Sequence, residues 1–177
     1  MLAAMNQPVM KTTRSNRVLA IDPGYDRLGL AVVEGDAGRP THVWSECVIP
    51  KKGSPSIRLA SVFNEVQKAI STYAPTVIAV ETLFFSVNKK TALGVAEARG
   101  AVLAAAGVAH LEVAEYSPAH VKLAVTGHGG ASKEAIARMV PRLISLPKKA
   151  RRLDDELDAI ALGIAALAEK RFSDEID

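Results

Sequence analysis

The alternation of apolar and polar positions divides the first part of the chain into short strands. Residues 18–21 form a continuous apolar run, and apolar residues recur at every second position from Leu28 to Val32. The Asp22-Pro23-Gly24 sequence between them predicts a tight turn, because proline fixes φ and glycine tolerates a positive φ. We expect a further turn at 34–39, a third strand at 42–49 and a loop at 50–55.

Helical periodicity begins further along the chain. Apolar residues recur at helical spacing between Leu59 and Tyr73, which predicts an amphipathic helix over 56–73. The run TVIAVE at 76–81 has the composition of a strand buried on both faces. A loop at 82–88, a helix at 90–107 and a strand at 111–116 follow. Further helices are expected at 117–126, 132–145 and 154–170, with Pro141 kinking or interrupting the second of these.

This order of strands and helices predicts an α/β fold, with a mixed central β-sheet flanked by α-helices. At 177 residues, the chain is long enough for one domain with a substantial core, which we place at 17–170. Residues 1–16 lack a periodic apolar pattern and are expected to form a disordered N-terminal leader, and 171–177 a C-terminal tail. Only 5% of the residues are aromatic, so the core must be built from aliphatic side chains.

Composition also bears on location and partners. No apolar run approaches the length of a membrane span, and the N-terminus lacks the apolar segment of a secretory signal, so we expect a cytoplasmic protein that does not bind membranes. Cys47 is the only cysteine, which excludes an internal disulfide and a cysteine-rich zinc site; it is expected in the core. The net charge is +3, and basic residues gather in the C-terminal half, which indicates a polyanionic partner.

Acidic residues lie at the ends of two predicted central strands. Asp22 ends the first strand and Glu81 ends TVIAVE. The last helix opens with DDELD, where acids in the first turn are favourable against the helix dipole. Asp158 lies a full turn further in, with Asp154 or Asp155 one turn before it on the same side. Helical phase alone does not choose between these two.

This set of acids predicts a particular chemistry. A site made of carboxylates, without histidine or cysteine, selects Mg²⁺ or Mn²⁺ over zinc. Bound divalent ions would relieve the repulsion among the acids, and two such ions suit phosphodiester hydrolysis. Phe84 and Phe85 follow Glu81 in the predicted loop, where aromatic rings can stack on unpaired bases.

Four sequence blocks resemble the RuvC-type Holliday-junction resolvases, a family with a ribonuclease H-like fold. The blocks are IDPGYDRLG, VETLFF with NKKTAL and EARG, YSPAHVKLAVTGHGGASK, and LDDELDAIAL. The resemblance implies that Asp22, Glu81, Asp155 and Asp158 are the catalytic metal ligands, since the D-x-x-D spacing of the last block selects Asp155 over Asp154. It places Phe84 on the aromatic residue that wedges into the junction. The other DNA-binding residues implied, including those that flank the matched positions, are Phe85, Lys89, Lys90, Arg99, Lys122 and Lys133.

The resemblance also implies an activity and partners. The expected enzyme is a Mg²⁺-dependent crossover junction endodeoxyribonuclease, with two ions in each active site and Mn²⁺ as a substitute. It would resolve four-way DNA junctions by paired symmetric nicks, leaving 5′-phosphate and 3′-hydroxyl ends, in homologous recombination and DNA repair. The two-fold symmetry of a junction favours a homodimer. A branch-migration motor of the RuvA and RuvB type is the expected partner.

Other functions fit parts of the sequence. The Asp22-Pro23-Gly24 hairpin with Gly29 resembles the phosphate-binding hairpin of sugar kinases and actin-like ATPases, but those proteins need two such domains around a nucleotide. A YqgF-type RNA-processing nuclease of the same fold is closer, although such chains match the second and third blocks less well. A non-catalytic junction-binding protein would gain only repulsion from carboxylates that face phosphates.

Overall fold

The structure is a computed structural model, which describes residues 16–82, 89–149 and 151–173, with side chains described at 16–82, 92–149 and 151–169. Most of the expected leader and of the C-terminal tail lies outside these residues. The helices and strands run in the order β1 (Arg17–Pro23), β2 (Leu28–Asp36), β3 (Arg39–Val48), α1 (Pro55–Tyr73), β4 (Val77–Glu81), α2 (Lys89–Val108), β5 (Val113–Tyr116), α3 (Pro118–Thr126), α4 (Lys133–Leu143) and α5 (Asp154–Ser173).

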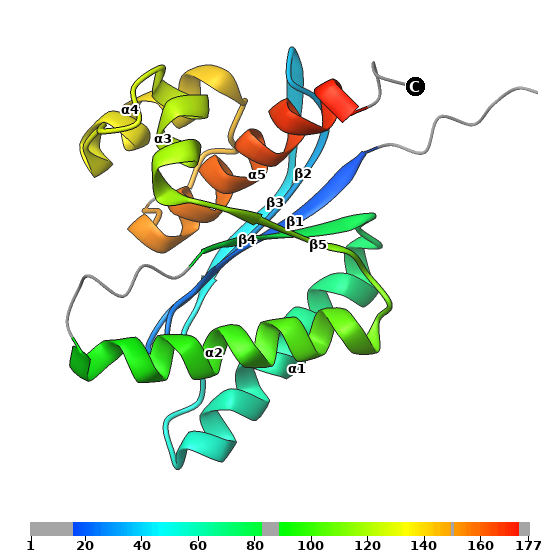
Figure 1. Cartoon of the computed structure of the whole chain (residues 1–177), viewed down its shortest axis with the longest axis vertical. Coiled ribbons are helices and arrows are strands. Elements are labelled where there is room, and N and C mark those ends of the chain that lie inside the picture. The colour runs from blue at the N-terminus through cyan, green and yellow to red at the C-terminus, as the bar shows by residue number, and fades with distance from the viewer. Residues whose placement is uncertain (1–15, 83–88, 150, 174–177) are drawn as a thin grey trace, which may run out of the picture.

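The strands form one mixed sheet with the order β3-β2-β1-β4-β5. The β1–β2 and β2–β3 pairs are antiparallel, whereas β1–β4 and β4–β5 are parallel. Helices α1 and α2 cover one face of the sheet, and α3, α4 and α5 cover the other (Figure 1). The expected fold class, a mixed sheet flanked by helices, is therefore confirmed.

The period of two along each strand sorts the core into two layers. Leu19 and Ile21 of β1 point toward α1 and α2, while Val18 and Ala20 point toward α5. Strand β4 divides in the same way and is buried on both faces, as its continuous apolar sequence predicts. The residues that face α5 are mostly small, and Gly163 of α5 packs closely against Val33, which lets this helix lie close to the sheet.

Several boundaries differ from those expected. Strands β2 and β3 extend into the turn expected at 34–39, because their backbones stay paired as far as Asp36 and Arg39. Strand β5 begins two residues later than expected, and α5 continues past 170 to Ser173. Helix α4 is not interrupted at Pro141 and ends two residues beyond it. Within the described residues, no helix is both long enough and apolar enough to cross a membrane.

Cys47 is not a core residue, contrary to expectation. It lies on β3 with its side chain on the α5 side of the sheet, where it is partly exposed and faces Asp155. Strand β3 is the edge strand of the sheet, so it is less covered than β1 or β4.

Candidate active site

Asp22 and Glu81 are brought together by strand pairing. Ile21 pairs with Val80 across the parallel β1–β4 ladder, so the next residues along the two strands, Asp22 and Glu81, are neighbours. Because side chains alternate along a strand, Asp22 lies on the same face of β1 as Val18 and Ala20. Glu81 likewise lies on the same face of β4 as Val77 and Ala79. These four apolar residues all face α5. Both carboxylates therefore lie on the face of the sheet that α5 covers, at the end where α5 begins.

Helix α5 completes this group with Asp158. A cavity of about 230 Å³ lies between the sheet and the helices. Its lining joins three acids, two lysines and an apolar floor: Asp22, Glu81, Asp158, Lys122, Lys133, Pro118, Val121, Ile136 and Leu162. Three of the four expected acids thus share one cavity, and both expected DNA-binding lysines of α3 and α4 lie at the same place.

Asp155 points to the other side of the α5 N-terminus. Its Oδ2 lies 3.1 Å from Nε of Arg27, and the Cys47 thiol is 4.0 Å away from the same oxygen. The side chain lines a second cavity, of about 520 Å³, next to the loop between β1 and β2. The backbone of Asp155 nevertheless packs against the sheet at Gly29, the residue paired with Asp22.

Asp154 differs from Asp155 in its surroundings. Its side chain is exposed and lines neither of the two cavities described above, but a third cavity of about 160 Å³ that it shares with Lys133 and Asp158. The charge of Asp155 acts on Asp22 across the site, together with those of Asp158 and Glu81. The choice of Asp155 as the second acid of the D-x-x-D pair stays a prediction, which the action of its charge on Asp22 supports.

The electrostatics of the site are those of crowded carboxylates. Burial, followed by the charges of Asp158, Glu81 and Asp155, raises the pKa of Asp22 from 3.8 to about 7. Burial and the charge of Asp158 also raise the pKa of Glu81, against the opposing charges of Lys133 and Lys122. The site therefore holds more negative charge than its lysines balance.

The ammonium group of Lys133 lies beside Asp158, where a metal ion could also bind. Its Nζ donates a hydrogen bond of 3.0 Å to Asp158 Oδ2. Burial by itself would lower the pKa of Lys133, but the hydrogen bond and charge of Asp158 outweigh that effect and raise it. A group that attracts an ammonium ion in this way also suits a divalent metal ion.

The donor set fits hard divalent cations, which prefer carboxylate oxygens. Within the described part of the chain, no three side chains of His, Cys, Asp and Glu are gathered as they stand into a ligand set. Asp155 and Asp158 are instead paired with Arg27 and Lys133. Both cationic side chains are about half-exposed or more, and the two aspartates, with Asp22 and Glu81, are the residues that would hold a divalent ion.

The remaining expected DNA-binding residues have different placements. Arg99 of α2 is mostly buried and its guanidinium lies 2.5 Å from Glu115 of β5, so the structure does not bring it to the lysines of the cavity. The side chains of Lys89 and Lys90 lie outside the described residues, although the backbone of both belongs to the first turn of α2. Phe84 and Phe85 also lie outside the described residues.

Two residues that support the site were missed by sequence reasoning. Arg27 pairs with Asp155, but nothing in its sequence context distinguishes it from a solvated arginine. Gly29 meets the backbone of α5 so closely that an added Cβ would lie 2.0 Å from the Asp155 carbonyl oxygen. The sequence offered a signal only for Gly29, because a glycine within a strand often marks close backbone approach.

The fold and the site together define a class, a ribonuclease H-like nuclease with acids at the ends of adjacent central strands and on a covering helix. A family model described as Crossover junction endodeoxyribonuclease RuvC matches residues 18–166. A relative with that description from Moorella thermoacetica is 43% identical over 148 residues, which cover 83% of this chain and 88% of the relative. This chain therefore belongs to the RuvC family of crossover junction endodeoxyribonucleases, which are metal-dependent nucleases.

Solved structures agree with this assignment. The structure of Thermus thermophilus RuvC in complex with Holliday junction substrate is 34% identical, with a TM-score of 0.80 over 89% of this chain and 96% of that chain. The yeast mitochondrial Holliday junction resolvase Ydc2 has a TM-score of 0.65 at 11% identity, over 86% of this chain and 79% of its own. At that identity the likeness extends to the fold alone.

Proposed function

We propose that this chain resolves four-way DNA junctions by paired symmetric nicks, in homologous recombination and DNA repair. The observation that carries the proposal is the cavity in which Asp22, Glu81 and Asp158 meet beside Lys122 and Lys133. Carboxylates in such a place suit metal-dependent hydrolysis, and the lysines suit a phosphate backbone. The solved T. thermophilus relative bound to a Holliday junction supports the choice of substrate.

In this proposal, Asp22, Glu81, Asp155 and Asp158 are the catalytic residues and hold two Mg²⁺ ions, for which Mn²⁺ can substitute. When bound, such ions would provide an activated water and charge stabilisation for the leaving 3′ oxygen, the chemistry that yields 5′-phosphate and 3′-hydroxyl ends. Asp22 and Glu81 lie at the ends of paired strands, so their backbones are held in place. The side chains of Asp155 and Asp158 would change rotamer to bind the ions, each leaving its present cationic partner.

We assign DNA contacts to Lys122 and Lys133, which lie beside the acids. Lys133 is engaged by Asp158 in the structure, and it would be available to a phosphate if Asp158 held an ion instead. Contacts by Lys89, Lys90, Phe85 and Arg99 are also part of the proposal. For Arg99, such a contact requires its side chain to leave Glu115.

We expect Lys122→Ala and Lys133→Ala to weaken junction binding. Each variant should also reduce the slope of log K against log[salt] by about one unit, because each phosphate contact releases counterions. Fluorescence titrations with a labelled junction at several salt concentrations measure both quantities. Lys68→Ala is the matched control, since Lys68 lies on α1, on the opposite face of the sheet, with an exposed side chain. An unchanged slope for both variants would assign these lysines to a solvated surface.

Phe84 is proposed to stack on a base that unpairs at the crossover. We expect Phe84→Ala to bind junctions nearly as well as the wild type but to cut them far more slowly, because stacking on an aromatic ring is worth about 1–3 kcal/mol per base. Junctions with unpaired bases at the cut site should restore the rate. The measurement is single-turnover cleavage of paired and unpaired junctions. A variant that is equally slow on both would contradict the stacking role.

The enzyme is proposed to act as a homodimer with α2 at its interface. Leu93, Gly100, Ala104 and Gly107 follow one another at helical spacing and are all exposed, and the partly exposed Glu97 lies on the same side of α2. Apart from Glu97, this side of the helix is apolar. An added Cβ at Gly100 or Gly107 would meet no other atom within 4 Å. By contrast, Ala105 is fully buried and Ala101 packs against the core, so substitutions at these two positions cannot report on an interface.

Gly100→Arg should therefore convert the wild-type dimer to a monomer, since a long side chain in place of this glycine would hold two such helices apart. Analytical ultracentrifugation of both proteins measures this. Ala60→Arg, at an exposed position of α1, is the matched control and should remain dimeric. A monomeric wild type that still makes paired nicks would rule out the dimer, and a dimeric Gly100→Arg protein would move the interface elsewhere.

A cytoplasmic location and a branch-migration motor of the RuvA and RuvB type complete the proposal. The experiment that tests the proposed function is incubation with Mg²⁺ and three substrates: a synthetic four-way junction, a linear duplex and an RNA–DNA hybrid. We expect paired nicks in the junction and little cleavage of the other two. Preferred cleavage of the hybrid would indicate an RNA-processing nuclease, and binding of the junction without cleavage would indicate a non-catalytic protein.

A further inference from the structure

Glu156 is the one buried charged or polar residue found among the described residues, with 1% of its surface exposed. It lies next to Asp155 in the sequence and two residues before Asp158. A carboxylate removed from water in this way is costly unless it is paired and hydrogen-bonded. The surroundings of Glu156 therefore have to supply both positive charge and donors.

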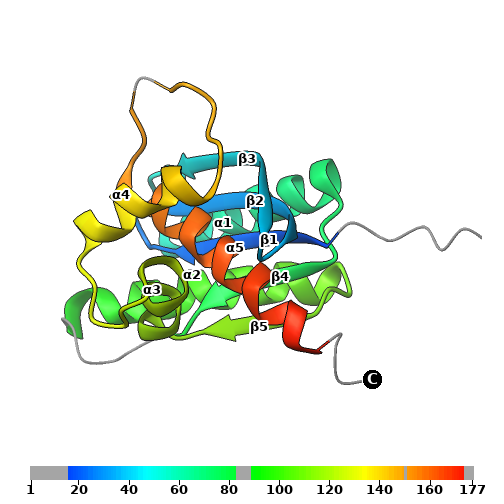
Figure 2. The same cartoon turned by 90° about the horizontal axis from the view of Figure 1, so that it is seen from above.

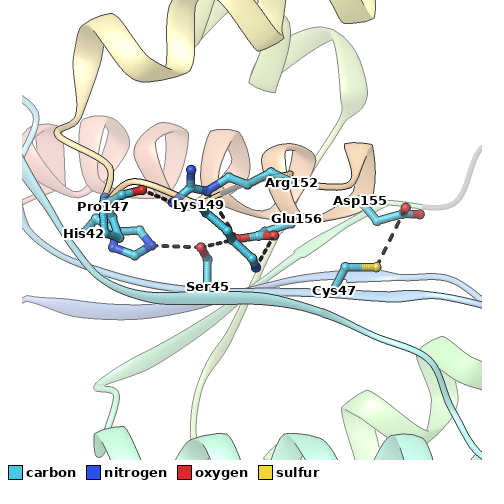
Figure 3. Close-up of polar contacts among 8 residues, drawn as sticks. All are labelled: His42, Ser45, Cys47, Pro147, Lys149, Arg152, Asp155 and Glu156. Carbon is cyan, nitrogen blue, oxygen red and sulfur yellow. Dashed lines mark hydrogen bonds and ion pairs between the residues drawn. The ribbon is translucent and has the colours of Figure 1, made fainter.

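Three side chains meet this need (Figure 3). Lys149 Nζ lies 2.8 Å from Oε2 of Glu156, and Arg152 Nε lies 3.4 Å from Oε1. The Ser45 hydroxyl donates to Oε1 at 2.7 Å. Outside this ring of contacts, His42 bonds to the Ser45 hydroxyl at 2.8 Å, and Arg152 donates to the carbonyl of Pro147 at 2.7 Å.

A bulge in β3 makes part of this network possible. Residues three apart on a regular strand point to opposite faces, so His42 and Ser45 would be separated by the sheet. In β3, Val33 pairs with His42 and Val32 with Trp44, which leaves Val43 as an extra residue. The bulge places His42 and Ser45 on the same face, under the N-terminus of α5.

The network joins three segments, of which β3 is far from the other two in the sequence. Lys149 and Arg152 belong to the segment between α4 and α5, which has no helix or strand of its own among its described residues and loops out beside β3 (Figure 2). Ser45 belongs to β3, and Glu156 to the first turn of α5. The buried Glu156 carboxylate contacts side chains from the other two segments and so links all three.

We propose that Glu156 is a positioning residue for the active site, fixing the rotation of the α5 N-terminus so that Asp155 and Asp158 are presented to the metal ions. Two residues along an α-helix correspond to roughly 200° of rotation, so Asp158 lies on nearly the opposite side of α5 from Glu156. Holding Glu156 on the β3 side therefore holds Asp158 on the side of Asp22 and Glu81. The inference rests on the proposed roles of Asp155 and Asp158 as metal ligands.

The expected effect is large because metal sites are sensitive to small displacements. Misplacing a reacting or ligating group by about 1 Å can lower a rate by about 10²-fold. Residues that orient metal ligands typically change metal affinity or activity by 10- to 100-fold when they are substituted. A residue that only stabilised the fold would lower the melting temperature without a selective effect on the metal.

Glu156→Gln tests the proposal with little change in volume. We expect Mn²⁺ binding, measured by electron paramagnetic resonance without DNA, to weaken by about tenfold or more. The Mg²⁺ concentration for half-maximal single-turnover junction cleavage should rise by a similar factor, with junction binding in the absence of metal retained. Ser45→Ala leaves the charges in place and should shift both values in the same direction by a smaller factor. It serves as the test if Glu156→Gln does not fold.

Arg17→Met is the matched control. Arg17 also forms a partly buried ion pair, with Glu34, and donates to the Tyr73 carbonyl, but it lies at the opposite end of β1 from Asp22. It should lower the melting temperature and leave Mn²⁺ binding unchanged. Wild-type Mn²⁺ binding by the folded Glu156→Gln and Ser45→Ala proteins would overturn the proposal, as would equal weakening by Arg17→Met.

Asp158→Asn, measured in the same Mn²⁺ titration, separates this inference from the proposed function. If Asp158→Asn loses Mn²⁺ binding and Glu156→Gln keeps it, the metal site stands and the positioning role of Glu156 fails. If Asp158→Asn itself binds Mn²⁺ like the wild type, the proposed metal site fails and the positioning role fails with it.

Discussion

Asp158→Asn is expected to abolish cleavage of a four-way junction and to leave junction binding intact or tighter. Asp158 contacts the cavity that holds Asp22 and Glu81, and its neutral amide would be a poor ligand for a hard cation. The loss should be on the order of 10³-fold in the single-turnover rate, as for other groups that stabilise charge in a transition state. Binding should persist because the acids repel phosphates, and the substitution also releases Lys133 from its ion pair.

The same result is expected for Asp22→Asn, Glu81→Gln and Asp155→Asn. Asp154→Asn is the matched control, because Asp154 lies in the same turn of α5 but is exposed and, unlike Asp158, does not line the cavity that holds Asp22 and Glu81. Single-turnover cleavage and junction-binding titrations distinguish the two groups. An inactive Asp154→Asn protein, or a folded Asp158→Asn protein that no longer binds junctions, would contradict the assignment.

Asp22→Asn is expected to stabilise the metal-free protein at and above neutral pH. In the folded protein, burial and the neighbouring acids raise the pKa of Asp22 from 3.8 to about 7. Between these two values the folded state binds a proton that the unfolded state does not, so the free energy of unfolding falls as the pH rises. Above about pH 7 the full penalty of the buried charge is present, and an asparagine at this position avoids it.

The expected gain is on the order of 2–4 kcal/mol above pH 7, and it should shrink as the pH falls from about 7 to 4. Urea unfolding in the presence of a chelator, repeated across this range, measures it. Asp154→Asn should change the free energy of unfolding by less than about 1 kcal/mol. Mg²⁺ should stabilise the wild type and have little effect on Asp22→Asn. A stabilisation by Asp22→Asn that does not depend on pH would contradict the role assigned to the buried charge.

The positions of Asp22 and Glu81 could be predicted from the sequence because they follow from local geometry. Alternation along a strand decides which face a side chain occupies, and both acids end apolar runs of the kind that form central strands. The fold class and the approximate bounds of the helices were predicted for the same reason, since apolar periodicity is a property of each segment. Errors at the ends of β2, β3 and β5 arose where pairing with another strand decides how far a strand continues.

The choice between Asp154 and Asp155 could not be made from helical phase, although the resemblance to the family supplied it. Adjacent residues on a helix differ by roughly 100°, and both lie within reach of Asp158 until the helix is docked. In the structure, the approach of α5 to Gly29 and Cys47 turns Asp155 inward and leaves Asp154 exposed. The partners Arg27 and Lys133 depend on the same docking, because they come from segments distant in sequence.

By itself, the sequence determined the α/β architecture, the two strand-end acids and the all-carboxylate character of the site, because these depend on residue type and on spacing within one segment. Only the tertiary structure decided that Asp158 lines the cavity with Asp22 and Glu81, whereas Asp155 faces Arg27 and Cys47. It showed Glu156 to be buried in a network with Ser45, Lys149 and Arg152, although in the sequence it is one acid among several at a helix start. It also showed Ala105 to be in the core. The physical reason is that burial and pairing are relations between segments, and the docking of those segments sets them.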